Sequence, residues 1–315
     1  MNKFALLGTS GFVAPRHLKA IKDNNCELLT SMDVSDSVGV LDSYFPESEF
    51  FTSFEKFDRH IDALRREGRA IDYLTVASPN HLHDAHIRYG LRVGANVICE
   101  KPMVLAPEDL HSIAVMEQET NRRAYCILQL RLLPAIKEIR DRLAAQLNKS
   151  DELIDVCLTY ITARGKWYSA SWKGDENKSG GIAMNIGVHL FDLLTYLFGE
   201  AQEIAVSHND ADTMAGLIMF RNARVRWLLS VDASLLPSAD GGSRGVSYRN
   251  LRVGDDDIEF SSGFTDLHSK SYTQILEGNG FGIADVLPSL ELVKRIQTSE
   301  CMSLSASDMH PFLGV

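Results

Sequence analysis

Residues 4–14, with the sequence FALLGTSGFVA, decide the fold that we expect for this chain. The apolar residues predict a short buried strand, the small residues a tight turn, and the pattern through His17 and Ile21 a helix. This order is the setting of a dinucleotide fingerprint, in which backbone N–H groups face a pyrophosphate. The turn departs from G-x-G-x-x-G, since either Ser10 occupies the second glycine position or Gly11 does so in a longer loop. A plain strand-to-helix turn is the alternative interpretation.

A second strand is predicted at residues 28–33, and it ends in Asp33. An acid roughly 20 residues beyond the glycine turn is placed to bind the ribose hydroxyls of a dinucleotide. A carboxylate in that position repels a 2′-phosphate, so the pattern favours NAD over NADP. An aspartate in an ordinary turn is the alternative.

Strands and helices alternate through the first part of the chain. Helical spacing at residues 53–66 and 84–93 separates the apolar runs at 71–77 and 96–99, and Gly94 ends the second helix. Such alternation predicts a doubly wound parallel sheet, the Rossmann type of α/β fold.

Two of the predicted strands end in polar residues, Ser78-Pro79-Asn80 and Glu100-Lys101-Pro102. Ligands of open α/β sheets bind at the carboxyl ends of the strands, so both tripeptides are expected on one rim beside the glycine turn. A lysine there, partly desolvated and near a bound cation, has a lowered pKa and is able to take part in proton transfer. A surface salt bridge is the alternative for this lysine.

Composition narrows the class of protein. With 315 residues, 45% hydrophobic and 23% charged, the chain suits a soluble protein of two domains, which we place at residues 1–123 and 124–315. A net charge of −10 argues against a nucleic-acid surface, although a local basic pocket for an anionic ligand remains possible. The first apolar run is too short for a signal peptide, and no run approaches the ~18 apolar residues of a membrane-spanning helix.

The spacing of cysteines and histidines in the sequence does not indicate a disulfide or a metal site. The five cysteines are scattered without a CxxC pair, which favours reduced, mostly buried thiols of a cytosolic protein. His81, His83 and His86 lie close together, but no carboxylate or cysteine completes a set at ligand spacing. We interpret them as N-cap and surface histidines, and we expect no metal.

The second half predicts an α+β domain. Residues 154–162 alternate and are rich in β-branched residues, as in a long strand of an antiparallel sheet. Residues 182–198 predict an amphipathic helix on which Asn185 and His189, four apart, face the same way. The remaining elements are expected as helices at 134–147 and 287–296, strands at 125–129, 204–206, 214–220, 225–231 and 248–253, and a glycine-rich connection at 238–245.

One short span of this acidic protein combines cations with aromatic rings. It contains Arg164, Lys166, Trp167, Tyr168, Trp172, Lys173 and Lys178. Guanidinium and ammonium groups pair with phosphates and carboxylates, and rings stack on a sugar or base, so the span suits a nucleotide-sugar acid. A solvated charged loop is one alternative. Single-stranded nucleic acid is another, which the net charge disfavours.

Taken in order, these motifs resemble the Gfo/Idh/MocA oxidoreductase family. The resemblance rests on the glycine turn, the acid after the second strand, the two rim tripeptides, and residues 181–189, GIAMNIGVH, which are similar to the family's G-x-x-x-D-x-x-x-H signature. Asn185 stands where most members carry aspartate. The family implies a Rossmann domain followed by a domain with a large open, mainly antiparallel sheet.

Further segments are similar to one branch of this family, the bacterial UDP-N-acetylglucosaminuronate 3-dehydrogenases. They are residues 14–17, 129–131, 160–168, 171–174 and 178–181. Members of this branch share the asparagine at Asn185 and serve the synthesis of lipopolysaccharide O-antigen sugars. The resemblance implies a cytoplasmic, NAD-dependent enzyme that oxidises the C3 hydroxyl of UDP-N-acetylglucosaminuronic acid to a 3-keto sugar. It also implies a homotetramer, with 2-oxoglutarate as a possible second substrate that recycles NADH in place.

On this hypothesis His189 takes the hydroxyl proton, Lys101 stabilises the growing alkoxide and relays the proton, and Asn185 orients the sugar. Which of His189 and Lys101 is the base stays open. The residues expected to bind the cofactor are Gly8, Ser10, Gly11, Phe12, Val13, Asp33, Ser78, Asn80, His83, Glu100, Lys101 and Gln129. Those expected to bind the substrate are Lys101, Arg131, Arg164, Lys166, Tyr168, Trp172, Lys173, Asn185 and His189.

Two alternatives are kept. One is a dehydrogenase of another sugar or of inositol. The other is a catalytically silent NAD-binding sugar sensor, against which the presence of both Lys101 and His189 argues.

Overall fold

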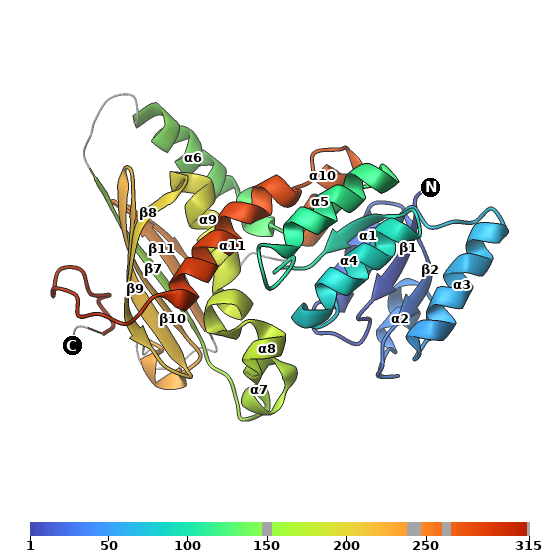
Figure 1. The fold of residues 1–315 in the computed structure, drawn as a ribbon, viewed down its shortest axis with the longest axis horizontal. Helices are drawn as coiled ribbons and strands as arrows, with labels where there is room; N and C mark the ends of the chain where they lie inside the picture. The colour runs from blue at the N-terminus through green and yellow to red at the C-terminus, as the bar shows by residue number, and fades with distance from the viewer. Residues whose placement is uncertain (147–152, 238–246, 260–265, 314–315) are drawn as a thin grey trace. The chain divides into compact units, whose positions relative to one another are not determined.

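The computed structural model describes residues 1–146, 153–237, 247–259 and 266–313 (Figure 1). Its contacts divide the chain into two compact units. Unit 1 comprises Met1–Leu132 and Thr265–Leu287, and unit 2 comprises Leu133–Phe264 and Pro288–Val315. This division differs from the expected one at residue 123, because a late segment of the chain packs with the first unit.

Unit 1 is built on a parallel sheet. Its strands are β1 (Lys3–Leu7), β2 (Glu27–Met32), β3 (Glu49–Phe51), β4 (Tyr73–Val76), β5 (Asn96–Cys99) and β6 (Ala124–Cys126). They lie in the order β3-β2-β1-β4-β5-β6, and every neighbouring pair is parallel. The predicted doubly wound sheet is therefore confirmed, with the reversal of strand order between β1 and β4 where such folds bind ligands.

Helices cover this sheet, and α4 and α5 pack side by side (Figure 1). The helical elements are α1 (Ala14–Asp23), α2 (Val40–Tyr44), α3 (Phe54–Arg66), the 3₁₀ turn η1 (Asn80–Leu82), α4 (His83–Arg92), α5 (Asp109–Thr120), the 3₁₀ turn η2 (Gln129–Leu132) and α10 (Leu267–Leu276). α10 packs against α1, and its Tyr272 and Ile275 join the core beneath Phe4 and Leu18. The sequence pattern did not predict α10.

Unit 2 is built on a mixed sheet. Its strands are β7 (Ile154–Thr162), β8 (Ala201–Asn209), β9 (Thr213–Phe220), β10 (Ala223–Ser230), β11 (Ser247–Val253) and β12 (Asp256–Glu259). The order is β12-β11-β7-β10-β9-β8, and all pairs are antiparallel except β7 with β10. The predicted mainly antiparallel sheet is confirmed. The predicted connection at 238–245 lies outside the described residues.

The helical elements of unit 2 include a π-helical turn. They are α6 (Pro134–Gln146), α7 (Trp167–Ala170), the 3₁₀ turn η3 (Trp172–Gly174), α8 (Glu176–Ser179), the π turn η4 (Ala183–Gly187), α9 (Val188–Phe198), the 3₁₀ turn η5 (Ala233–Leu235) and α11 (Ile283–Thr298), which begins in unit 1. α9 packs on the sheet through Phe191, which meets the Trp227 ring edge-to-face at 5.3 Å. Gly187 allows the close approach, since a Cβ there would lie 2.5 Å from Leu229 Cδ1.

Among the described residues, one helical run, Glu176–Phe198, is long and apolar enough to cross a membrane by length and composition. The expectation that no run approaches that length is therefore wrong on those two criteria. Within the protein, 78% of its apolar window is buried, as expected for a helix at the centre of a domain core.

The cysteines are free thiols, four of them buried and Cys301 exposed, as predicted.

Candidate functional site

The glycine turn brings the ends of β1 and β4 together. Gly8 has a φ of 93°, and a Cβ on it would lie 2.4 Å from the Ala77 carbonyl carbon, so this position requires glycine. The turn then enters α1, which has no side-chain cap at its N-terminal residue Val13. Phe12 is 82% exposed beside it. A glycine turn that leads directly into a helix is the arrangement in which backbone N–H groups bind an anion such as pyrophosphate.

Asp33 lies at the neighbouring strand end. Its Oδ2 accepts a hydrogen bond of 2.9 Å from the Ser10 N–H, and its Oδ1 accepts one of 2.9 Å from the Ser35 N–H. The carboxylate is thereby fastened to the glycine turn, in the position expected for an acid that binds ribose hydroxyls.

The two rim tripeptides are joined by a histidine. His83 Nδ1 lies 2.6 Å from the Pro102 carbonyl oxygen, and His83 Nε2 lies 2.7 Å from that of Ser78. Burial lowers the pKa of His83, although the two carbonyl oxygens favour its protonated form. The interpretation as an N-cap or surface histidine is wrong for this residue, which is 1% exposed and holds two loops together.

The other two histidines of this run differ from it. His81 is exposed, in agreement with the sequence interpretation, whereas His86 is only partly exposed and lies against the Ser78 hydroxyl at 2.9 Å. Burial lowers the pKa of His86 to about 4. Asn80, expected to contact the cofactor, is buried on η1 at the same rim.

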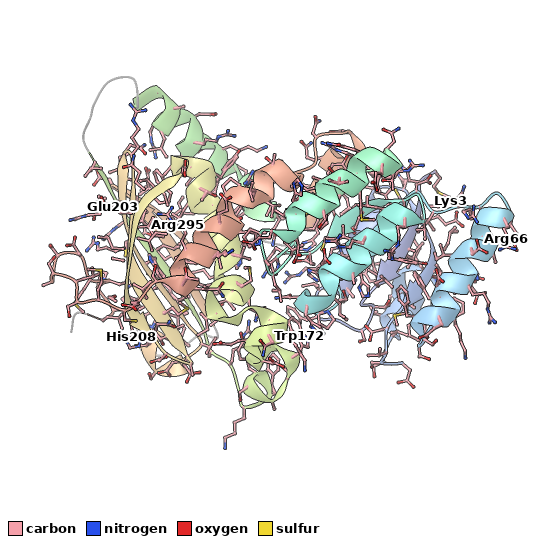
Figure 2. The ribbon with its side chains drawn as sticks, viewed as in Figure 1. Lys3, Arg66, Trp172, Glu203, His208 and Arg295 are labelled. Atoms are coloured by element: carbon pink, nitrogen blue, oxygen red, sulfur yellow. The ribbon has the colours of Figure 1, made fainter. Side chains whose placement is uncertain are left out.

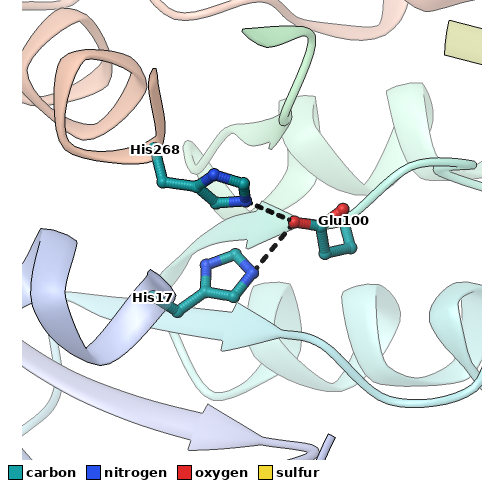
Figure 3. Close-up of side chains that lie close together, drawn as sticks. All are labelled: His17, Glu100 and His268. Carbon is teal, nitrogen blue, oxygen red and sulfur yellow. Dashed lines mark hydrogen bonds and ion pairs between the residues drawn. The ribbon is translucent and has the colours of Figure 1, made fainter. Parts of the chain in front are cut away.

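Glu100 lies at the centre of a buried polar cluster (Figure 3). Its Oε1 accepts hydrogen bonds from His17 Nε2 at 3.1 Å and from His268 Nε2 at 2.8 Å. Its Oε2 lies 3.3 Å from the backbone nitrogen of Lys101, whose N–H donates to it. Burial raises the pKa of Glu100, but the hydrogen bonds from the two imidazoles outweigh burial and hold it well below its usual range.

A chain of donors extends from this cluster into the core. The Tyr272 hydroxyl lies 2.9 Å from His17 Nδ1 and 2.9 Å from the Thr75 hydroxyl. Burial lowers the pKa of His17, which favours the neutral ring. If His17 donates to Glu100 through Nε2, its Nδ1 must accept from Tyr272, whose oxygen then accepts from Thr75. The buried side chains of His17, Tyr272 and Thr75 thus each have a hydrogen-bond partner.

His17, Glu100 and His268 are also residue types that bind metals, and their ligand atoms lie within 4.8 Å of one another. The contacts of 2.8 and 3.1 Å are ordinary hydrogen-bond lengths, and both rings direct a nitrogen at the same oxygen. We therefore interpret the group as a hydrogen-bonded carboxylate.

Gln129 and Arg131 follow β6 on η2. Gln129 Oε1 is buried without a hydrogen-bond partner among the described residues, so it is an acceptor that a bound cofactor could satisfy. Arg131 is 5% exposed, contacts Asp285 Oδ1 at 3.2 Å and stacks over the Phe281 ring at 5.0 Å. It fastens η2 to the start of α11 within unit 1, and its role in substrate binding stays a prediction.

These features fit a dinucleotide. The cradle at Gly8 excludes any Cβ, Asp33 lies beside the turn, and Gln129 offers an unsatisfied acceptor at the same sheet edge. NAD is the cofactor that this set of residues is suited to hold.

In unit 2, the cationic and aromatic span forms cation–π pairs; Figure 2 shows Trp172 in the region of α7 and α8. Lys173 Nζ lies 4.6 Å from the Trp172 ring centre and 5.6 Å from that of Trp167. Burial, and then the nearby Arg164 charge, lower the pKa of Lys173. The Arg164 guanidinium lies 5.8 Å from the Tyr168 ring centre, and Lys166 is exposed. The expected interleaving of cations and rings is thus present.

Asn185 lies on the π turn, and its Nδ2 donates a hydrogen bond of 2.8 Å to the Tyr168 hydroxyl. Both residues are buried, and burial raises the pKa of Tyr168. Single π-helical turns inside longer helices are frequent at functional sites. The structure therefore joins two of the predicted substrate residues.

His189, on the first turn of α9, packs its ring edge-to-face with Tyr160 of β7 at 5.6 Å. The Arg249 guanidinium lies 4.9 Å from the centre of the Tyr160 ring. Arg249 is on β11, directly opposite Tyr160 of β7 in the strand register. Neither Tyr160 nor Arg249 was expected in the site from the sequence. Alternation along β7 is a signal for Tyr160, but no local signal marks Arg249. Lys101 belongs to unit 1 and His189 to unit 2, so their expected meeting stays a prediction.

Each of the two units contains a segment that matches a domain of known proteins. Residues 2–127 match an oxidoreductase family with an NAD-binding Rossmann fold, named for Gfo, Idh and MocA, and residues 152–246 match its C-terminal α/β domain. The solved structure of the WlbA (WbpB) dehydrogenase from Thermus thermophilus in complex with NAD and UDP-GlcNAcA is 44% identical, with a TM-score of 0.93, covering 99% of this chain and 100% of that chain. A complex of the same enzyme with NAD and alpha-ketoglutarate is 45% identical, with a TM-score of 0.93 and the same coverage.

A curated relative, the glucose-6-phosphate 3-dehydrogenase of Bacillus subtilis, is 28% identical over 209 residues, which are 63% of this chain and 54% of that protein. The chain thus spans about half the length of the curated relatives it matches.

Proposed function

Because the chain belongs to the Gfo/Idh/MocA oxidoreductase family, we propose that it is an NAD-dependent dehydrogenase of a nucleotide sugar. Its proposed reaction is oxidation of the C3 hydroxyl of UDP-N-acetylglucosaminuronic acid to the 3-keto sugar. The observation that carries this proposal is the full-length similarity, at 44% identity, to a dehydrogenase crystallised with NAD and UDP-GlcNAcA.

NAD, when bound, accepts the hydride. The chain's own residues bind, orient and move the proton. The cradle at Gly8, the acid Asp33 and the acceptor Gln129 support the binding of the cofactor in unit 1. His189 takes the hydroxyl proton, and Lys101 stabilises the growing charge and relays the proton.

The substrate half rests on unit 2. Asn185, held by Tyr168, orients the sugar ring. The cations of the span from Arg164 to Lys173 bind the phosphates and carboxylate, and the rings they cover stack on the sugar or base. We further propose a cytoplasmic homotetramer that serves O-antigen synthesis and uses 2-oxoglutarate, also called alpha-ketoglutarate, to reoxidise its NADH.

The test begins with mass spectrometry of ligands released from purified protein, where we expect NAD or NADH. The protein is then incubated with UDP-N-acetylglucosaminuronic acid and 2-oxoglutarate, and the 3-keto sugar and 2-hydroxyglutarate are measured. The second substrate is needed because an enzyme that retains NADH would give no absorbance change in bulk. A protein that binds NAD and converts none of this sugar would overturn the proposal.

Lys101→Met should abolish turnover while leaving NAD binding largely intact, because the change removes the ammonium group and keeps a side chain of similar length. Steady-state turnover and calorimetric titration with NAD measure the two effects. Near-normal turnover in the variant would show that Lys101 has no part in proton transfer.

A second candidate is a dehydrogenase of another sugar, which the partial match to a glucose-6-phosphate 3-dehydrogenase favours. A panel of UDP sugars, hexose phosphates and inositol separates the two. A silent NAD-binding sensor would bind one of these compounds and convert none.

A further inference from the structure

We propose that His268 is a positioning residue: together with His17 it fixes the Glu100 carboxylate so that the second carboxylate oxygen holds the backbone N–H of Lys101. The importance of this for turnover rests on the proposed function, in which Lys101 handles the proton. The hydrogen-bonding role itself rests on geometry within unit 1 alone.

Three elements from distant parts of the sequence meet at this carboxylate. His17 comes from α1, Glu100 from the end of β5, and His268 from α10. Their exposed fractions are 0%, 6% and 4%, so little water is available to replace a missing partner. A buried carboxylate with so few alternatives must be satisfied by the groups around it.

The two imidazoles bind one oxygen and leave the other for the backbone. His17 Nε2 and His268 Nε2 lie 3.1 and 2.8 Å from Oε1, which sets the direction of the carboxylate plane (Figure 3). Oε2 is then left 3.3 Å from the Lys101 nitrogen. The backbone position of Lys101, and with it the starting point of its side chain, therefore depends on how the carboxylate is held.

His268 contributes the shorter of the two imidazole bonds, and its position on α10 allows a clean experiment. His17 lies on α1 directly after the glycine turn and is also bound by Tyr272, so its substitution would disturb the cofactor cradle. When His268 loses its donor, the carboxylate keeps one imidazole partner and is free to rotate. The Lys101 N–H then loses a fixed acceptor.

The experiment compares His268→Gln with His268→Asn. A glutamine amide reaches the position of Nε2, whereas an asparagine amide is one methylene shorter and cannot donate to Glu100. We expect His268→Asn to lower kcat on the order of 10²-fold, as small misplacements in active sites do. The NAD dissociation constant and the sugar KM should change by less than about threefold, and His268→Gln should recover most of kcat. His268→Leu, of similar volume and without a donor, should behave as His268→Asn and replaces it if that variant does not fold.

A second readout needs no substrate. Amide hydrogen exchange at Lys101 should be faster by about tenfold or more in His268→Asn than in the wild type, because the Glu100 Oε2 acceptor of this N–H is no longer held in place. It should be close to wild type in His268→Gln. The Glu100 amide, which donates to the Val76 carbonyl oxygen at 2.9 Å, is an internal control that should not change. His310→Gln, at a buried histidine of unit 2, is the matched control for loss of a buried imidazole.

A merely structural role predicts that His268→Asn lowers the unfolding temperature and leaves kcat and Lys101 exchange unchanged; that result would overturn the proposal. If the wild type fails to convert the nucleotide sugar, the proposed function fails, but the exchange comparison still decides whether His268 positions Lys101. Faster Lys101 exchange in both His268→Asn and His268→Gln would also refute it, because the donor at Nε2 would then be irrelevant.

Discussion

At the scale of single residues, the Tyr160 ring contacts both a histidine and a cation. The His189 ring packs edge-to-face with it, and the Arg249 guanidinium lies over its face. A guanidinium on an aromatic face stays charged and adds a positive field nearby. A cation at this place is compatible with the proposed substrate, which carries two phosphates and a carboxylate.

Asn185 provides a test of whether the anionic part of the proposed substrate lies nearby. In Asn185→Asp the Tyr168 hydroxyl donates to the new carboxylate, so the bond now made by the Asn185 amide at 2.8 Å is retained with reversed polarity. The added negative charge should raise KM for UDP-N-acetylglucosaminuronic acid about tenfold, or ~1.4 kcal/mol, through repulsion at an effective dielectric constant near 20. Steady-state kinetics measure KM, and the unfolding temperature should stay close to wild type.

Asn185→Ala is the matched control, since it removes the hydrogen bond without adding charge. It should destabilise the protein by about 1–3 kcal/mol, because the buried Tyr168 hydroxyl loses a partner. An unchanged KM in Asn185→Asp would mean that the anionic part of the substrate does not lie near this residue.

Residues with a local signature were predictable from the sequence. Gly8 and Asp33 stand at fixed offsets around a strand and a turn, and Glu100 ends a buried strand. His268 was missed because its partner in hydrogen bonding, Glu100, lies 168 positions earlier in the chain. No pattern within a short window contains that relation, and the same holds for Arg249 and the Tyr160 ring.

At the scale of elements, α10 completes unit 1 although it comes late in the chain. Tyr272 is fully buried, its ring centre lies 5.8 Å from that of Phe4, and Ile275 packs in the same core. The helix is short and its sequence, LHSKSYTQIL, is largely polar, so periodicity gave no indication of it. A domain boundary drawn at one point of the sequence also cannot represent a unit made of two segments.

A fragment of residues 1–132 should therefore fail to fold cooperatively. Loss of a buried tyrosine and a buried isoleucine costs several kcal/mol, about 2–5 for each, against a total domain stability of about 5–15 kcal/mol. Residues 1–132 joined to 266–282 by a flexible linker of about 15 glycine and serine residues should fold and bind NAD. Circular dichroism melting and NAD titration measure both properties.

The same linked fragment with Tyr272→Ala is the control, and it should lose most of the recovered stability. Cooperative folding of 1–132 alone, with NAD affinity equal to that of the whole chain, would contradict the view that α10 is part of unit 1.

At the scale of the whole molecule, alternation of strands and helices was enough to predict the parallel sheet, since each crossover helix is adjacent to its strands in sequence. The second sheet was predicted as mainly antiparallel, but not the parallel pairing of β7 with β10. That pairing joins strands separated by the whole helical region and by β8 and β9. The order of strands in such a sheet is set by long-range packing, which local patterns do not contain.

Stability of the whole molecule should depend on pH through its buried histidines. Burial lowers the pKa values of His17, His83, His86 and His310. Below their ordinary value near 6.5 the unfolded chain therefore binds more protons than the folded one, and stability falls as pH falls. Glu100, whose folded pKa is also lowered, loses its stabilising contribution only as pH drops below the ordinary glutamate value of about 4.3. Between pH 6.5 and 4.5 the histidines therefore lower stability as pH falls, while Glu117, whose pKa burial raises, acts in the opposite sense.

His310 allows one of these contributions to be isolated. Its pKa is lowered to about 4 by burial, its Nε2 lies 3.0 Å from the Thr159 hydroxyl, and its Nδ1 accepts from the Phe312 N–H at 3.2 Å. Each such histidine contributes up to about 1.4 kcal/mol per pH unit between its folded and unfolded pKa values. In urea unfolding at 25 °C, the loss of stability between pH 6.5 and 4.5 should be smaller in His310→Gln than in the wild type by roughly 1–3 kcal/mol. Equal losses in the two proteins would mean that His310 has the same pKa in the folded protein as in the unfolded chain.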